Sequence, residues 1–344
     1  KTAYEIYQCD WSSDVCSSDL LDNHEFHFHY GFSILKINKP VLTNMEYKKR
    51  ENTSFGYVFA ILAAVMFGSV STLAKPLVSA VNPLLLASMI YLVSAATLTP
   101  LAYKQKFPYS KKNYLLIIAI SLSGSVIAPS LFFLGLIHAS ASDAALIANG
   151  ETFFSVLLAI LFFKERIGRI GYIATALILA GMIIVSTDLN FSNLTLGEFH
   201  YQDWLLILSM LFWGIDNNLS RILAEKVNVA KIAQIKSAIG GSIMFVIAIF
   251  GLGTQINLQA SQIIPILVLG TVGFAASLYF FMQSLKRIGT VRAVLIFSLA
   301  SIFGLGAALV FLHEPISWYQ IIAAAIMIIG IWLMNRRDLT INPI

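Results

Sequence analysis

The sequence predicts an all-α integral membrane protein whose ten transmembrane helices form two inverted five-helix repeats. Three observations lead to this fold class: the composition, the spacing of the apolar segments and an internal repeat. Of the 344 residues, 58% are hydrophobic and 12% are charged, and the mean hydropathy is +0.77. Soluble domains have about 45–50% apolar and about 25% charged residues, so this composition excludes a water-soluble enzyme.

Ten apolar segments are long enough to cross a bilayer as helices, which takes about 20 residues each. They use about 200 of the roughly 300 residues from Met45 onward. Only short loops remain, and these leave no room for a soluble catalytic domain. The expected segments are 55–74, 83–103, 114–137, 142–163, 170–186, 203–222, 230–252, 263–285, 290–312 and 317–335.

The basic residues of the loops predict the direction of these helices, because Lys and Arg gather in cytoplasmic loops. With the amino end inside, nineteen Lys and Arg fall on the cytoplasmic side, and only Lys75 falls outside. This inner count includes Lys236, near the start of segment 230–252. The prediction is a multi-pass protein of the cell membrane with both termini in the cytoplasm. The charges form no patch, so nucleic-acid binding is not expected despite a net charge of +5.

The first 44 residues differ from the rest and contain both cysteines, Cys9 and Cys16. The stretch YQCDWSSDVCSSDL resembles translated sequencing-adapter sequence, and we expect the native protein to start at Met45. A metal site and a disordered tail are the alternative interpretations of this leader. We divide the chain into the leader (1–44), a first repeat (45–187), an outer connecting loop (188–202), a second repeat (203–337) and a cytoplasmic tail (338–344).

The second half of the chain repeats the first. At an offset of 149, Gly124 matches Gly273 and Glu165 matches Glu314, and at an offset of 146, Gly68 matches Gly214. Each half contains five predicted spans, which is an odd number, so the second half must enter the membrane from the opposite face. Inverted repeats of this kind are typical of secondary transporters, whose substrate site lies near the middle of the bilayer.

The segment 142–186 resembles the signature half of the EamA-type drug/metabolite transporters. It has a small-residue entry, the Asn-x-Glu of Asn149 and Glu151, an apolar run, a Glu in a short loop, and a fifth helix that ends near Gly181. The segment 202–335 resembles the second copy. The resemblance implies a membrane transporter without a cofactor, and it says little about the substrate. One departure is Ala300, which stands where the second copy often has a glutamate.

Glu151 is the foremost candidate for a substrate or ion site. By helical rise it lies about 13 Å from the outer end of its span, and a carboxylate at that depth must be paired, protonated or exposed to a wet cavity. Asp216 and Asn217 are expected to line the same pore, since lipid cannot satisfy polar side chains. Hydrogen bonding between helices is the structural alternative for each. The remaining candidates are Asn149, Trp213, Tyr279, Gln283, Ser69, Thr72, Ser298 and Ser301.

The repeat also predicts a pair of gates. Lys75 aligns with Arg221, and Glu314 aligns with Glu165, at opposite ends of the predicted bundle. We expect the ion pairs Lys75–Glu314 and Arg221–Glu165 to latch the two faces alternately. Ordinary interfacial charges are the alternative interpretation.

Together these observations predict a secondary active transporter of a small organic metabolite, working by alternating access as an exporter or exchanger. The substrate would be amino-acid-like, nucleobase-like or an amphipathic cation, with a proton or a second solute exchanged for it, and the protein would be a monomer or a homodimer. No Walker sequence is present to bind ATP. An integral-membrane enzyme and a passive channel remain the alternatives.

Overall fold

The computed structural model describes residues 53–108, 110–163, 168–187 and 201–334. Every regular element within these ranges is an α-helix or a π-helix, and no strand occurs among them. The predicted leader and most of the predicted connecting loop lie outside the described residues. The all-α prediction is therefore confirmed for the part of the chain that forms the helical bundle.

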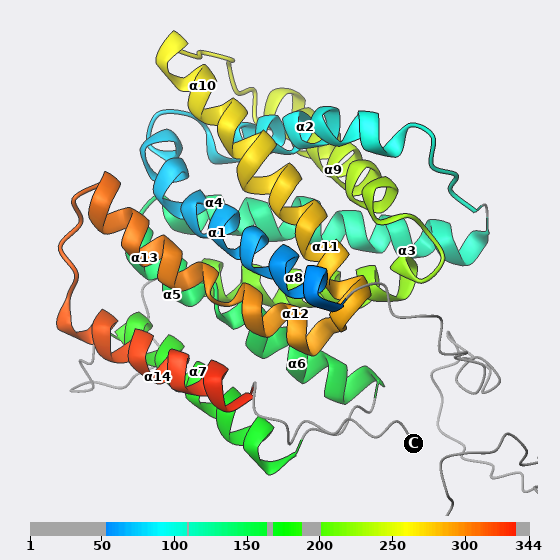
Figure 1. The fold of residues 1–344 in the computed structure, drawn as a ribbon. Coiled ribbons are helices and arrows are strands. Elements are labelled where there is room, and N and C mark those ends of the chain that lie inside the picture. Colours follow the sequence, from blue (N-terminus) through cyan, green and yellow to red (C-terminus); the bar gives the residue numbers. More distant parts are fainter. Residues whose placement is uncertain (1–52, 109, 164–167, 188–200, 335–344) are drawn as a thin grey trace, which may run out of the picture. The chain divides into compact units, whose positions relative to one another are not determined.

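Each of the ten predicted ranges contains at least one helix (Figure 1). The first half holds α1 (Thr53–Val78), α2 (Pro83–Ala102), α3 (Lys111–Leu122), η2 (Ser123–Ile127), α4 (Ala128–Leu136), α5 (Ala141–Ile147), α6 (Gly150–Phe163) and α7 (Arg169–Thr187). The second half holds α8 (Tyr201–Ala224), α9 (Val229–Val246), η3 (Ile247–Gly251), α10 (Ala260–Val268), η4 (Leu269–Ala276), α11 (Ser277–Ile288), α12 (Thr290–Phe297), α13 (Ala300–Phe311) and α14 (Trp318–Met334).

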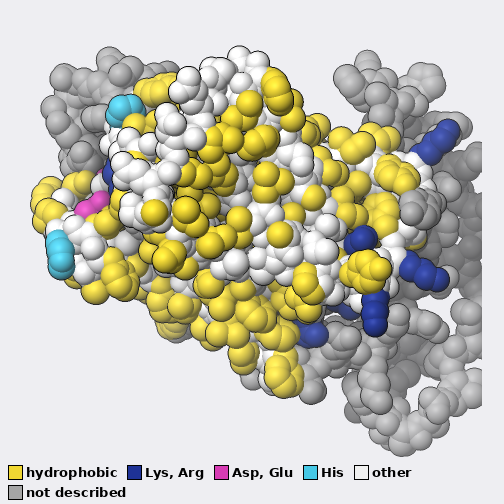
Figure 2. Space-filling model, turned by 90° about the horizontal axis from the view of Figure 1, so that it is seen from above, with side chains coloured by type: hydrophobic (Ala, Val, Ile, Leu, Met, Phe, Trp, Pro, Cys, Tyr) yellow, Lys and Arg dark blue, Asp and Glu magenta, His cyan; other side chains and the backbone are white. Residues whose placement is uncertain are grey.

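The helices have the length and composition of a multi-pass membrane protein. Six helical stretches in the described residues are long and apolar enough to span a bilayer, and three more apolar helices are shorter. Large apolar side chains are exposed on many of these helices, as expected where lipid is the solvent. Figure 2 shows hydrophobic side chains spread across one face, with most of the visible Lys and Arg side chains at one end.

Two of the predicted spans are not continuous helices. The helix pairs α5/α6 and α12/α13 are each interrupted, at positions that match to within one residue at the offset of 149. At the first break the amides of Glu151 and Thr152 bond to carbonyls three residues back, at 3.1 and 3.0 Å. An α-helix bonds to the carbonyl four residues back, so the chain tightens locally just before Glu151. Hydropathy alone does not detect such a break.

The two halves enter the bundle from opposite ends. Gly56, near the start of α1, lies against Ile288 at the end of α11, while Lys75, near the end of α1, bonds to carbonyls at the end of α4. In the second half it is the start of α8 that meets the end of α4, since Gly135 lies against the Gln202 carbonyl. Helix α1 therefore ends where α8 begins, as the inverted repeat predicts.

Matching contacts relate the two halves by a pseudo-twofold exchange. Gly181 of α7 lies against the Ala323 carbonyl of α14, and its counterpart Gly330 of α14 lies against the Ala174 carbonyl of α7. Helices α2 and α9 also pack on each other. Each is capped by an asparagine: Asn82 accepts from the amides of the first turn of α2, and Asn228 does the same for α9.

Candidate functional site

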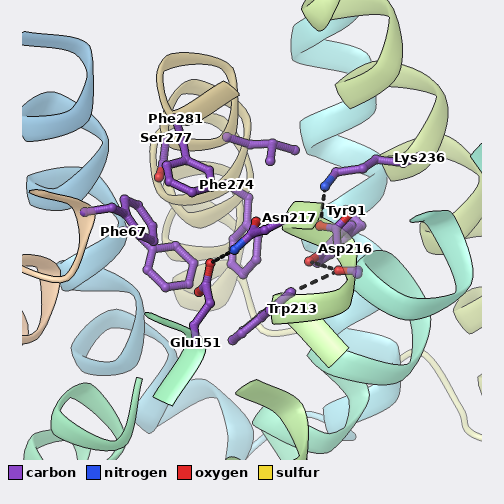
Figure 3. A pocket seen from close by; sticks show the side chains of 13 residues that line it. Phe67, Tyr91, Glu151, Trp213, Asp216, Asn217, Lys236, Phe274, Ser277 and Phe281 are labelled. Carbon is purple, nitrogen blue, oxygen red and sulfur yellow. Dashed lines mark hydrogen bonds and ion pairs between the residues drawn. The ribbon is translucent and has the colours of Figure 1, made fainter. Parts of the chain in front are cut away.

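A pocket lies between helices from both halves of the chain, near the break before α6. Its volume is about 50 Å³, counted as the space open to the centres of water molecules. A pocket of this size can hold water or a small polar group of a solute. The lining residues are Phe67, Tyr91, Gly124, Glu151, Trp213, Asp216, Asn217, Lys236, Phe274, Ser277, Leu278, Phe281 and Phe297 (Figure 3).

Glu151 reaches the pocket from the first turn of α6. It is only 6% exposed, and its Oε1 accepts a hydrogen bond of 2.6 Å from Asn217 Nδ2. The amino end of a helix favours a negative charge, because the free amides and the helix dipole point toward it. Asn217 also donates to Ser155 Oγ at 3.2 Å, which fixes the amide that holds the carboxylate.

Asp216 and Lys236 form a buried ion pair on the other side of Asn217 (Figure 3). Lys236 Nζ lies 2.6 Å from Asp216 Oδ2, and the two side chains are 3% and 5% exposed. The second carboxylate oxygen accepts from Ser220 Oγ at 3.0 Å. Both oxygens of Asp216 thus have partners, whereas the partner of Glu151 is a neutral amide.

The Gly124 carbonyl ties two aromatic side chains to the wall of the pocket. It accepts hydrogen bonds of 3.1 Å from Tyr91 Oη and from Trp213 Nε1. Gly124 belongs to the π-helical segment η2, and such segments often mark functional sites. A Cβ at this position would lie 2.2 Å from Asp216 Cγ, so only glycine lets the carboxylate approach.

The remaining wall of the pocket is aromatic. The Phe67 ring lies 5.7 Å from that of Trp213 and 5.2 Å from that of Phe297, while Phe281 and Phe297 are 4.4 Å apart. Aromatic faces attract cations as well as apolar groups. The pocket therefore combines two carboxylates, one ammonium and several aromatic faces, and its charged side chains are buried.

The pocket brings together four of the predicted site residues: Glu151, Trp213, Asp216 and Asn217. Seven others do not line it. Asn149 Nδ2 donates to Ser301 Oγ at 2.8 Å, so these two side chains join α13 to the break before α6. Thr72 contacts the Gly304 carbonyl at 3.5 Å, and Ser69 bonds within its own helix. Of the other three, Tyr279 packs against Phe280. Gln283 bonds to Arg287, and the Ser298 carbonyl accepts a hydrogen bond from Ser301 Oγ.

The sequence interpretation missed Lys236 because it counted this residue among the cytoplasmic loop charges. Lys236 lies seven residues into α9, which is about 10 Å along the helix axis. A lysine at that depth needs a buried partner, and Asp216 was already a candidate on the preceding helix. The depth of the lysine within its span was therefore the signal that could have found it.

The predicted outer gate has different partners from those expected. Lys75 and Glu314 form no direct ion pair in the described residues. Instead, Lys75 Nζ donates to the carbonyls of Leu136, Ile137 and Ala139 at the end of α4, at 2.9, 3.0 and 2.5 Å. Glu314 accepts from the first amides of α5 and from Ser142 Oγ at 2.7 Å.

Each charge thus satisfies a helix end of complementary sign, which is why the two need not meet. Together they clamp the α4–α5 turn from both sides. The second predicted gate is not described to the same extent: Arg221 is half-buried near the end of α8, and Glu165 lies outside the described residues.

Replacing Lys75 by methionine is expected to loosen the α4–α5 turn. Bonds to a charged group contribute about 1.5–3 kcal/mol, and partial exposure of Lys75 reduces this to about 1 kcal/mol. Amide hydrogen exchange of residues 138–143 should then accelerate about fivefold. The exposed Lys226→Met is the matched control. Unchanged exchange in Lys75→Met would show that the clamp does not hold the turn.

Comparisons with known proteins agree with this architecture. A model of the EamA-like transporter family matches residues 54–187 and again residues 201–336. An uncharacterized transporter of Methanothermobacter thermautotrophicus is 28% identical over 298 residues, which cover 81% of this chain and 86% of the relative. The uncharacterized transporter YcxC of Bacillus subtilis is 23% identical over 80% of this chain and 91% of its own length.

A solved crystal structure shares the fold, with a TM-score of 0.63 over 82% of this chain and 96% of the other, at 17% identity. The helices, the inverted halves and the two matched segments lead to one conclusion. The chain belongs to the EamA-like transporter family, and the family's domain is present in it twice.

Proposed function

We propose that this membrane transporter carries a small organic cation through the pocket by alternating access, in exchange for a proton or a second solute. The observation that carries the proposal is the charge of the pocket. Its charged lining residues are two carboxylates and one ammonium, which leave one negative charge when Glu151 is ionised. A buried site with a net negative charge favours a cation or a proton.

The repeat itself provides an argument that these charges serve the pocket and not the fold. The counterparts of Asp216, Lys236 and Glu151 in the other half are Val70, Ile90 and Ala300. All three are apolar and at most 5% exposed. The fold therefore accommodates apolar residues at the positions that are equivalent by the repeat. Buried charges that packing does not require are expected to have a functional role.

Glu151 is suited to exchange because no cation in the described part of the chain forms an ion pair with it, and its partner is the neutral Asn217 amide. A carboxylate that binds either a proton or a solute amine, but not both, couples the movement of one to the return of the other. The aromatic wall adds favourable contacts for the apolar part of an amphipathic amine. We further propose that all ten helical ranges cross the membrane, with both termini in the cytoplasm, in agreement with the loop charges.

A flux screen in proteoliposomes tests this function. Phenethylamine, amino acids and nucleobases would be offered to liposomes that contain the full-length protein, with an imposed pH gradient and with empty liposomes as the control. We expect saturable accumulation of phenethylamine against its gradient. Non-saturable downhill flux would indicate a channel, and preference for an uncharged nucleobase would contradict the proposed cation site.

A further inference from the structure

Lys236 places its side-chain ammonium group inside the pocket. Its Nζ binds Asp216 Oδ2 at 2.6 Å, and the residue is 3% exposed. An ammonium has three N–H donors, and in the described residues Asp216 is its one partner. Lys236 therefore binds Asp216, one of the two carboxylates of the site, in the way that the amine of a solute would.

We propose that Lys236 sets the charge of the cargo: it neutralises Asp216, so the pocket accepts one positive charge, at Glu151, and rejects solutes that carry two. This inference rests on the proposed function, because it assumes that Glu151 binds a cation. A second cationic group would have to displace Lys236 from Asp216, whose other oxygen is already engaged by Ser220. The displaced ammonium would then be buried without a partner.

A merely structural ion pair is the competing explanation. Against it, Asp216 and Lys236 line the pocket, and their counterparts Val70 and Ile90 are buried without any charge. Packing supports the same comparison: Asp216 lies against Gly124, and its counterpart Val70 lies against Gly273, the counterpart of Gly124. The fold thus accepts an apolar residue at this contact, and the charged pair acts on what enters the pocket.

The test compares a monoamine with a diamine of the same chain length. Binding of butylamine and of putrescine would be measured by calorimetry on the purified full-length protein and on Lys236→Gln. In the wild type we expect butylamine to bind more tightly than putrescine. In Lys236→Gln the freed Asp216 carboxylate accepts the second ammonium, so the ratio of putrescine to butylamine affinity should rise by at least about tenfold.

Three control variants separate charge from other effects. Lys231→Gln removes a lysine from the same helix outside the pocket and should leave the ratio unchanged. Lys236→Arg keeps the internal cation and should also keep the wild-type ratio. Asp216→Asn/Lys236→Gln removes the whole pair but keeps the net charge, so its ratio should stay low. This double variant keeps the test decisive if Lys236→Gln alone does not fold. A raised ratio of putrescine to butylamine affinity in the double variant would contradict the proposal.

The outcomes distinguish the two proposals. If butylamine binds to the wild type but not to Glu151→Gln, and the ratio does not change in Lys236→Gln, the inference about Lys236 is wrong and the proposed cation site stands. If neither amine binds to the wild type or to Lys236→Gln, the proposed function fails, and the inference fails with it.

Discussion

Replacing Asp216 by valine and Lys236 by isoleucine together is expected to leave the protein at least as stable as the wild type. These are the residues that the other half of the chain has at the equivalent positions, Val70 and Ile90. Apolar replacement of a buried ion pair is often neutral or stabilising by about 1–4 kcal/mol. Asp216→Val alone should instead destabilise by about 3–5 kcal/mol, because it leaves the Lys236 ammonium buried and unpaired.

Thermal unfolding in detergent of the wild type, both single variants and the double variant gives the coupling energy of the pair. Single variants as stable as the wild type would show that the pair is not desolvated. The same double variant should transport amines at least about tenfold more slowly, because methyl groups replace the polar wall opposite Glu151. Transport at the wild-type rate would exclude the pair from the site.

The sequence predicted the inverted repeat and the polar centre of the site for definite physical reasons. Lipid cannot satisfy carboxylates and amides, so Glu151, Asp216 and Asn217 had to face protein or water, and the structure places all three in one pocket. Trp213 was a candidate because its aromatic ring could line a cavity for a flat or amphipathic solute. It lines the pocket because the Gly124 carbonyl orients its ring.

Other features depend on three-dimensional contacts that no sequence pattern reports. The break before α6 is a change of backbone hydrogen bonding by one residue, and hydropathy does not register it. The opposite charges of Lys75 and Glu314 suggested a direct ion pair. Instead, Lys75 binds carbonyls at the end of α4 and Glu314 binds amides at the start of α5, because helix ends carry partial charges of their own. Ser69, Tyr279 and Gln283 bond or pack within their own helices, and Thr72 contacts the Gly304 carbonyl of α13, as polar residues of membrane helices often do.

Glu151→Gln is expected to abolish uphill amine transport while the protein remains folded. Glutamine keeps the shape of the side chain. It also keeps an oxygen that can accept the hydrogen bond from Asn217 Nδ2, which is 2.6 Å long to Glu151 in the wild type. What it loses is the negative charge and the capacity to bind a proton. A hydrogen bond between the amine and a charged carboxylate contributes about 1.5–3 kcal/mol to binding. Without this charge, the affinity for the amine should fall about 10–100-fold.

The measurement that tests the cation site most directly compares Glu151→Gln with Glu225→Gln, the same substitution at an exposed carboxylate after α8. Both proteins, reconstituted in liposomes, would be assayed for amine accumulation driven by a pH gradient and for amine–amine exchange at equal pH. We predict that Glu225→Gln behaves as the wild type. Glu151→Gln should lose the gradient-driven accumulation and retain only slow exchange at high amine concentration. Undiminished, pH-dependent accumulation in Glu151→Gln would contradict the assignment of this pocket as the transport site.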